Sequence, residues 1–328
     1  MNIFLTFDYE LFFGDNPGTV GKCMIEPTNE LRSIAAKHQI KMVFFVDVGY
    51  LVRGREFAKD NPILAEDLDR VENQIVELVQ EGHDIQLHIH PHWERSKFEQ
   101  GKWSIQTDGS YKLDDFTDEE VRSIVMRYKR YLDNIIGYKT TCFRAGGWCI
   151  QPFIRLHELF KELDLKYDSS VFPGGHFVSP HYDFDFRKAP NKAKYRFEDD
   201  VCSEDENGYF TEYPISSWHY SPLFYWQLYV LGRLDPINHK MLGDGKFLSQ
   251  PGRKKAVLTR FTWNHVSADG FYASKLKMIF ESFKKKGRSD MVIIGHPKSL
   301  TRFSLNKLDE FVNTVKVNSQ FQLFKHLK

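Results

Sequence analysis

The feature that most constrains the fold of this chain is a regular alternation of short β-type runs with longer helical patterns. The alternation continues through the 328 residues and is typical of parallel strands joined by crossover helices. The apolar, β-rich runs that are candidate strands are 3–7, 42–46, 85–88, 141–143, 166–168, 209–213, 256–261 and 291–294. This series predicts an α/β fold, a distorted (β/α) barrel of seven or eight strands.

Two of the helical segments have clear start signals. Asn61 and Pro62 supply an N-cap and a first-turn proline before apolar residues at helical spacing, and Gly82 ends that pattern. Thr117 and Glu120 form a capping box that begins a second helix. Shorter helical runs are expected at 153–163, 272–283 and 306–315. Strands and helices thus interleave as a (β/α) barrel requires.

No repeat, low-complexity segment or linker divides the chain, so we expect one domain over residues 1–328. Two irregular stretches would be insertions, at about 176–206 and 217–250. The first would form a loop or short hairpins over one end of the barrel, and the second separates the sixth and seventh candidate strands. The four cysteines are widely spread without C-x-x-C spacing, which indicates reduced structural thiols.

The charge balance of the chain argues against two classes of partner. Its 45 Lys and Arg residues are matched by 44 Asp and Glu residues, so no general attraction to nucleic acid or to an acidic membrane surface is expected. The longest apolar stretch, 223–232, is far below the roughly 20 residues of a transmembrane segment. The first residues form a strand pattern without the marks of a signal peptide. We therefore expect a cytoplasmic protein, of oligomeric state unknown.

Polar residues gather where the candidate strands end. In barrels of this type the chemistry lies at the carboxyl ends of the strands. The residues at those positions are Asp8, Glu10, Asp47, His88, His90, His92, Arg144, Asp168, Glu212 and His296. Their common place at one end of the predicted fold is the main argument for an enzyme.

The histidines follow the third candidate strand. Pro91 can start a helix or tight turn, and His88 and His92 are then four residues apart and able to face one centre. Neutral imidazoles at this spacing are good ligands for zinc or another divalent ion. His90 would face the opposite side or hydrogen-bond a ligand. Surface or hydrogen-bonded core histidines are the alternative.

Strand one supplies the carboxylates. The two-residue period of a strand puts Asp8 and Glu10 on one side and Tyr9 on the other. One carboxylate can bind a metal while the other acts as general base, and two histidines with one carboxylate leave a catalytic zinc its open position. His296, after the last strand, can protonate a leaving group, and Arg144 would pair with a strand-end carboxylate. A helix cap, a solvated Glu and a buried structural histidine are the alternatives.

At these residues the chain resembles the polysaccharide deacetylases of the NodB-homology type, carbohydrate esterase family four. The resemblance runs from Ile3 to His296 and keeps the order of five family motifs. The matching segments are Thr6-Phe7-Asp8, Gly82-His83-Asp84-Ile85 running to His88 and His92, Phe143-Arg144-Ala145-Gly146-Gly147, Tyr167-Asp168-Ser169-Ser170 and Gly295-His296.

The resemblance implies a distorted (β/α) barrel that hydrolyses acetyl groups on sugars with a divalent metal, often zinc. It makes Asp8 the general base and His296 the general acid, with Arg144 orienting Asp8 and Asp168 orienting or tuning His296. The implied ligands are His88, His92 and Glu10. The expected substrate-binding residues, from the same end of the fold, are Asp47, Gly146, Trp148 and Glu212.

The first motif departs from the family pattern, because Tyr9 stands where a second aspartate binds metal. Members of a variant branch of the family have Asp-x-Glu at this motif, so Glu10 is the expected third ligand. Asp8 and Glu10 can exchange roles. Some relatives with altered first motifs act without metal on cyclic ureides, so metal dependence stays open. The combination Phe-Asp-Tyr-Glu-Leu, Gly-Thr-Val and Gly-His-Pro-Lys resembles the WbmS-like branch associated with O-antigen loci.

For a deacetylase inside the cell, the expected substrate is an acetylated sugar in a precursor of a surface polysaccharide, with N-acetyl favoured over O-acetyl. The carrier would be a nucleotide or a lipid-linked glycan at the inner leaflet. The aromatic run 217–231 can contact a membrane interface or stack on sugar rings, and core packing or an oligomer contact is the alternative.

Three other functions fit parts of the pattern. His88 and His90 form a His-x-His pair like that of metal-dependent amidohydrolases and phosphoesterases, which usually carry it after the first strand. Two histidines with one carboxylate also describe a non-haem iron oxygenase site. A catalytically inactive saccharide-binding relative is the third alternative, because Tyr9 breaks the commonest motif.

Overall fold

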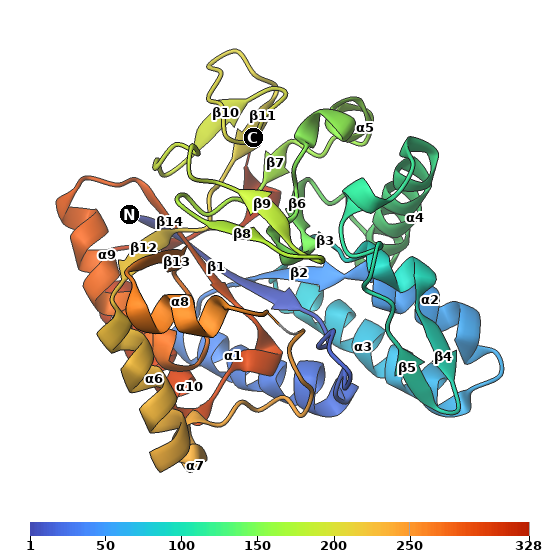
Figure 1. Cartoon of the computed structure of the whole chain (residues 1–328), viewed down its shortest axis with the longest axis horizontal. Coiled ribbons are helices and arrows are strands. Elements are labelled where there is room, and N and C mark those ends of the chain that lie inside the picture. Colours follow the sequence, from blue (N-terminus) through green and yellow to red (C-terminus); the bar gives the residue numbers. More distant parts are fainter. Residues whose placement is uncertain (249, 328) are drawn as a thin grey trace.

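The main sheet curls into a partial barrel in the computed structural model, which describes residues 1–248 and 250–327 (Figure 1). Its strands follow the order β10-β11-β7-β6-β3-β2-β1-β14, and β15 adds to the start of β1. All pairs are parallel except β10 with β11. The bounds are β1 (Asn2–Tyr9), β2 (Val43–Asp47), β3 (Asp84–Ile89), β6 (Cys142–Ala145), β7 (Tyr167–Asp168), β10 (Tyr195–Phe197), β11 (Phe210–Glu212), β14 (Asp290–Gly295) and β15 (Gln320–Phe321). The predicted α/β fold with a distorted barrel is confirmed.

The gap between the two ends of the sheet is bridged by single residues. Ile215, just after β11, pairs with Val292 of β14 in an isolated parallel bridge. Ser267, which follows β13 (Thr262–His265), pairs in the same way with Ile294. The second bridge places the segment after β13 beside the carboxyl end of β14. This segment contributes a residue to the site described below.

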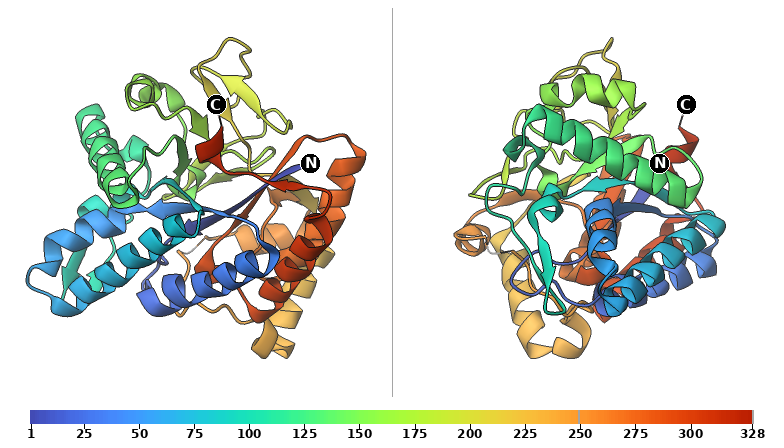
Figure 2. Two further views of the ribbon diagram at one scale, coloured as in Figure 1. Left: turned by 180° about the vertical axis from the view of Figure 1, so that it is seen from behind. Right: turned by 90° about the vertical axis from the view of Figure 1, so that its right-hand side faces the viewer.

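The helices cover the outer face of the curled sheet (Figure 2). They are α1 (Glu26–His38), α2 (Val48–Ala58), α3 (Pro62–Gln80), α4 (Asp118–Ile136), α5 (His157–Glu162), α9 (Leu276–Lys285) and α10 (Arg302–Val315). The predicted capping box is confirmed, because the Thr117 side chain accepts from the Glu120 amide at the start of α4. Helix α3 begins at Pro62 as predicted, although the Asn61 side chain makes no capping bond. Because helices cover one face and the barrel interior the other, strands such as β2 are buried along their whole length.

The two predicted irregular stretches contain short elements. The first holds the hairpin of β8 (His176–Val178) and β9 (Asp183–Asp185), followed by β10. The second holds β12 (Ser217–Tyr220), α6 (Pro222–Leu234) and α7 (Pro236–His239), while Ser249 near its end lies outside the described residues, as does Lys328. A further hairpin joins β4 (Lys97–Glu99) to β5 (Lys102–Ser104). In the described ranges, every helix is too short or too polar to cross a membrane.

One predicted strand is wrong. Residues 256–261 are mostly helical, in α8 (Arg253–Thr259), and the strand β13 begins only at Thr262. Val257 and Thr259 favour a strand, but Lys255, Ala256 and Leu258 beside them are good helix formers. Only Val257 of this helix is buried, so packing on one face decides the structure where the local preferences conflict.

Candidate active site

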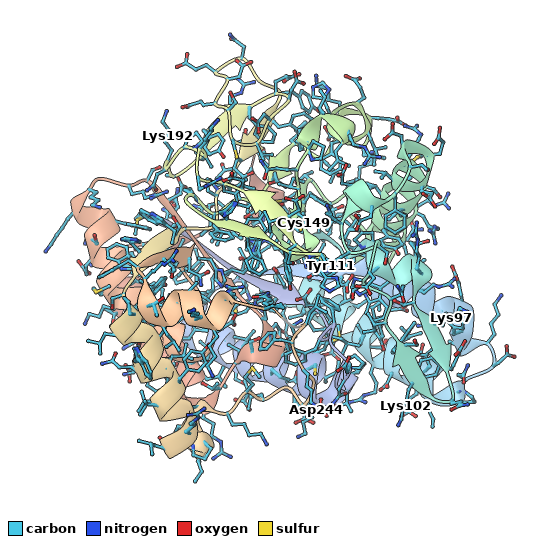
Figure 3. All side chains as sticks on the ribbon, viewed as in Figure 1. Lys97, Lys102, Tyr111, Cys149, Lys192 and Asp244 are labelled. Atoms are coloured by element: carbon cyan, nitrogen blue, oxygen red, sulfur yellow. The ribbon has the colours of Figure 1, made fainter. Side chains whose placement is uncertain are left out.

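The carboxyl ends of β1, β3 and β14 open into a pocket of about 730 Å³. Asp8, Glu10, His88, His90 and His296 line its base. Aromatic side chains form much of the wall, and one of them, Tyr111, lies near the middle of the molecule while labelled lysines such as Lys97 and Lys192 lie toward its edge (Figure 3). The predicted meeting of strand-end residues at one place is therefore present for these five.

Asp8 is held from one side and faces two histidines on the other. Its Oδ1 atom accepts a hydrogen bond from Nη1 of Arg144 at 2.6 Å. Its Oδ2 atom lies 3.6 Å from Nε2 of His296 and 3.9 Å from Nε2 of His88. Tyr9 points the other way, toward α3, where its hydroxyl donates to Gln74. The two-residue period of β1 thus removes Tyr9 from the site.

Arg144 is fixed by its own partners. Its Nε donates to the carbonyl of Ser169 at 2.8 Å and its Nη2 donates to the Ser169 hydroxyl at 3.0 Å. The guanidinium also lies over the ring of Phe45, 4.0 Å from the ring centroid. A buried guanidinium with these contacts has little freedom, so it holds the Asp8 carboxylate in one orientation.

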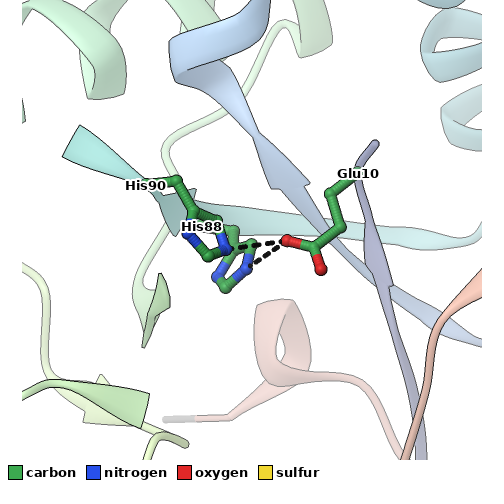
Figure 4. A group of neighbouring side chains, drawn as sticks. All are labelled: Glu10, His88 and His90. Atoms are coloured by element: carbon green, nitrogen blue, oxygen red, sulfur yellow. Dashed lines mark hydrogen bonds and ion pairs between the residues drawn. The ribbon is translucent and has the colours of Figure 1, made fainter. Parts of the chain in front are cut away.

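Glu10 meets two histidines (Figure 4). Its Oε2 atom lies 2.8 Å from Nε2 of His90 and 3.1 Å from Nε2 of His88. One donor atom from each of the three side chains lies within 4.8 Å of the others, and all three residues are buried. His88 Nδ1 contacts the Arg144 carbonyl at 2.8 Å, and because a carbonyl only accepts, this nitrogen carries the hydrogen. Two imidazoles, one carboxylate and a hydrogen bond that orients one imidazole fit a divalent metal such as zinc.

The two histidines of this group differ in their proton affinity. Burial lowers the pKa of both, but Asp8 and Glu10 more than offset it for His88 and raise its pKa to about 9. Burial dominates for His90, whose pKa falls to about 4. Without a metal, His88 is therefore protonated beside the two carboxylates, while His90 offers a neutral imidazole at neutral pH.

His92 stands apart from the group that the sequence spacing predicted it to join. Neither of its ring nitrogens has a hydrogen-bond partner in the described part of the chain, and its ring stacks on Tyr111 and packs against Phe13. The reason is that the backbone stays extended through His90, so the two-residue strand period continues and carries His90 to the same side as His88. That period is the signal by which the sequence could have placed His90 in the group.

His296 is oriented by Asp269, a residue that sequence reasoning missed. Nδ1 of His296 lies 2.8 Å from Oδ2 of Asp269, and the His296 amide donates to Oδ1 at 2.8 Å. Although burial lowers the pKa of His296, Asp269 outweighs it and the pKa is raised. The role expected for Asp168 needs correction, because its carboxylate turns back and accepts from the amide and hydroxyl of Ser170. An Asx-type turn at the end of the two-residue strand β7 holds it there.

Lys298 is the second residue that sequence reasoning missed. Its Nζ atom lies 2.8 Å from Oε1 of Glu10, and it also donates to the Leu11 carbonyl. Burial raises the pKa of Glu10, but the opposing effects of Lys298 and then His90 are together larger. The pKa of Glu10 is therefore well below its usual range. The Gly-His-Pro-Lys motif contains Lys298, but its sequence position says nothing of this contact.

Of the four expected substrate-binding residues, Trp148 lines the pocket. Gly146 leaves no room for a side chain, because a Cβ there would lie 2.5 Å from Nδ1 of His90. Asp47 accepts from the Trp93 indole at 2.6 Å, and Glu212 is buried beside Asp168. Among the described residues, these last three support the pocket from behind and do not line it.

Comparisons with known proteins agree on the fold. No family model matches the chain, and no match was found among the curated proteins. A solved structure from Mycobacterium smegmatis, described as a polysaccharide deacetylase, aligns over 99% of this chain and 87% of its own, at 16% identity and a TM-score of 0.53. One from Pseudomonas aeruginosa, also described as a polysaccharide deacetylase, aligns over 99% and 88%, at 11% identity and a TM-score of 0.52. The chain has the fold of these proteins.

The same fold also carries other activities. A solved allantoinase aligns over 99% of this chain and 87% of its own, at 12% identity and a TM-score of 0.53. The predicted resemblance is therefore confirmed at the level of the fold, and the WbmS-like branch stays a prediction. Because one fold serves several reactions, the function has to be argued from the site.

Proposed function

We propose that the protein is a metal-dependent hydrolase that removes an acetyl group from a sugar, an N-acetyl group in preference to an O-acetyl group. The observation that carries this proposal is the placement of Asp8. One oxygen of this carboxylate is held by Arg144 and the other faces His296, beside the group of Glu10, His88 and His90. The fold shared with proteins described as deacetylases supports the same reaction class.

Glu10, His88 and His90 would hold the metal, and zinc suits their mixture of imidazole and carboxylate. When bound, such an ion polarises a carbonyl and lowers the pKa of water. The contacts favour Glu10 over Asp8 as the ligand, because Glu10 reaches both imidazole nitrogens while Asp8 is engaged by Arg144.

Asp8 and His296 divide the proton transfers. Asp8 takes a proton from the attacking water as general base, and Arg144 keeps the carboxylate aimed. His296 gives a proton to the leaving amine as general acid. The Asp269 carboxylate behind it raises the pKa of His296, which keeps the imidazole protonated for this step.

The proposed substrate is a cytoplasmic precursor of a surface polysaccharide, as in the WbmS-like branch. The four cysteines are free thiols, as expected in a reducing compartment. The place of Lys298 in the site gives the Gly-His-Pro-Lys motif a structural role that this branch would share.

Helix α6 supports a peripheral contact with a membrane. Large apolar residues at helical spacing on α6 and α7 are 45% to 78% exposed. They are Leu223, Trp226, Val230 and Leu234 on α6 and Ile237 on α7. From 217 to 260 the sequence has seven Lys or Arg and two Asp or Glu. An apolar stripe within a basic segment matches an anionic lipid surface, which is the occupant we assign to it.

A metal-independent amide hydrolase is the second candidate. The observation that favours it is the ion pair of Lys298 with Glu10, because this ammonium already compensates one carboxylate of the site. The allantoinase fold neighbour shows that amide chemistry other than deacetylation occurs on this scaffold.

Metal content and acetate release together test the proposal. Protein purified without chelator or affinity tag should contain near-stoichiometric zinc and release acetate from acetylated sugars. The variant His296→Gln should keep the metal and lose turnover, and His88→Ala should lose both. Full acetate release by a metal-free protein would favour the second candidate, and saccharide binding without turnover would favour an inactive relative.

A further inference from the structure

Cations on the outer wall of the pocket face a base that holds its carboxylates. The carboxylates Asp8, Glu10 and Asp269 lie around His296, and Lys298, which also lines the base, is already paired with Glu10. The outer wall, made by α6 and α8, contributes the cations Arg233, Arg253 and Lys254. Within residues 1–248 and 250–327, none of these three cations forms an ion pair with a carboxylate.

Arg253 lines the pocket and is half-buried. Its guanidinium donates to the Gln250 side chain and lies over the ring of Phe177, 5.9 Å from the centroid. Lys254, beside it, lies over the ring of Tyr229, 4.9 Å from the centroid. The cationic wall therefore meets aromatic side chains on which a ring of a ligand can stack.

His265 provides an independent sign of a ligand. Its side chain is 7% exposed, it lines the pocket, and its Nδ1 atom has no hydrogen-bond partner in the part of the chain that the structure describes. The ring packs between Trp148 and Tyr272 and so has a fixed place. Burial holds the pKa of His265 well below its usual range, so the imidazole is neutral and Nδ1 can donate or accept. A buried nitrogen left without a partner costs free energy that a bound ligand would recover.

We infer that Arg253, Lys254 and His265 form a subsite for the diphosphate of an acetylated sugar carried on a diphosphate linkage. The inference rests on the proposed function, since it places the acetyl group at the base beside Asp8. The charge supports a diphosphate over a single carboxylate, because Arg233, Arg253 and Lys254 together bring three positive charges. A pocket of about 730 Å³ is in the range that holds a drug-sized ligand, which leaves room for more than a sugar ring.

The first experiment measures binding of inorganic diphosphate by calorimetry, which does not depend on turnover. Arg253→Gln is expected to weaken binding at least tenfold, the loss typical of one charge-assisted hydrogen bond. Lys255→Gln is the matched control, because Lys255 is an exposed lysine of the same helix that does not line the pocket. Circular dichroism of both variants excludes unfolding. Equal binding by wild type, Arg253→Gln and Lys255→Gln, or no binding by any, would overturn the subsite.

The second experiment compares kcat/KM for one acetylated sugar in three forms: free, linked to a nucleoside diphosphate, and linked to a short polyprenyl diphosphate in detergent. A diphosphate-linked form should be preferred at least tenfold, and Arg253→Gln should remove that preference. Which carrier is preferred identifies the source of the diphosphate. Turnover of the free sugar that equals the linked forms would overturn the subsite and leave the proposed function standing. Diphosphate binding that depends on Arg253, with no acetate released from any form, would keep the subsite and refute the deacetylase.

Discussion

The Nζ atom of Lys298 lies 2.8 Å from Oε1 of Glu10, the carboxylate whose other oxygen faces His88 and His90. Both residues of the pair are buried, and Lys298 also donates to the Leu11 carbonyl. The ammonium keeps Glu10 ionised and fixes its orientation toward the imidazoles. It also places a positive charge next to the residues that would hold a divalent cation.

Removal of that charge should tighten metal binding. A cation beside a ligand repels a second cation, so Lys298→Met is expected to lower the dissociation constant for zinc about tenfold, which is ~1.4 kcal/mol. Titration against a chelating dye measures it, with Lys255→Met as the control for loss of a distant charge. Weaker zinc binding by Lys298→Met would show that the lysine serves chiefly to position Glu10.

His90 and His92 should respond differently to truncation, because only His90 has a ring nitrogen close to Glu10. His90→Ala is expected to weaken zinc binding about 100-fold or more, a larger loss than removing a residue that merely orients a ligand. His92→Ala, an equally buried control two residues away, should retain near-stoichiometric metal in mass spectrometry. Loss of metal from His92→Ala alone would restore the ligand pair expected from the sequence spacing.

Asp269 should control the protonation of His296. In the general-acid role His296 must be protonated, and Asp269 raises its pKa. Asp269→Asn removes that effect, so His296 loses its proton at lower pH and the alkaline limb of the kcat profile moves to lower pH. At neutral pH we expect about a 100-fold loss of kcat. Asp168→Asn is the control, since Asp168 bonds Ser170 and leaves His296 untouched, and its alkaline limb should stay in place.

The apolar stripe of α6 should determine lipid binding. Leu234→Ser and Trp226→Ser each remove apolar area worth ~2 kcal/mol, so binding to vesicles of phosphatidylglycerol and phosphatidylcholine should fall at least tenfold at low salt. Ile63→Ser is the matched control, because Ile63 is 79% exposed on α3. Co-sedimentation measures the bound fraction. A wild-type dimer in light scattering that Leu234→Ser converts to monomer would assign the stripe to a second copy of the chain.

His83 should make the fold sensitive to acid. It lies at the opposite end of β3 from the site, where Nδ1 accepts from the Met42 amide at 3.0 Å, and burial lowers its pKa to about 4. In the unfolded chain His83 has a pKa near 6.5, so the unfolded state binds the proton first as the pH falls. The free energy of unfolding therefore decreases between about pH 6.5 and pH 4. The loss is at most ~3 kcal/mol. His83→Asn keeps an acceptor but does not titrate, so urea denaturation at pH 7 and pH 4.5 should show a smaller loss for the variant.

Much of the site could be predicted because it depends on local periodicity. Asp8 and Glu10 share a side of β1, and His88, Arg144 and His296 follow apolar runs that the barrel buries, so each reaches the same end of the sheet. His92 as a ligand stays a prediction, and it lies outside this group because a helical spacing was assumed for backbone that remains extended through His90. The prediction of a strand at 256–261 was wrong because residues that favour a strand and residues that favour a helix are mixed in this segment.

By itself, the sequence determined the alternation of strands and helices and the strand-end position of most site residues, because these follow from side-chain periodicity within a few residues. Only the tertiary structure decided that Asp269 orients His296 and that Lys298 pairs with Glu10. The bridges from Ile215 and Ser267 to β14 bring such distant segments together. Contacts of this kind depend on how the sheet curls and on which loop passes the end of β14, and no local pattern in the chain encodes that distance.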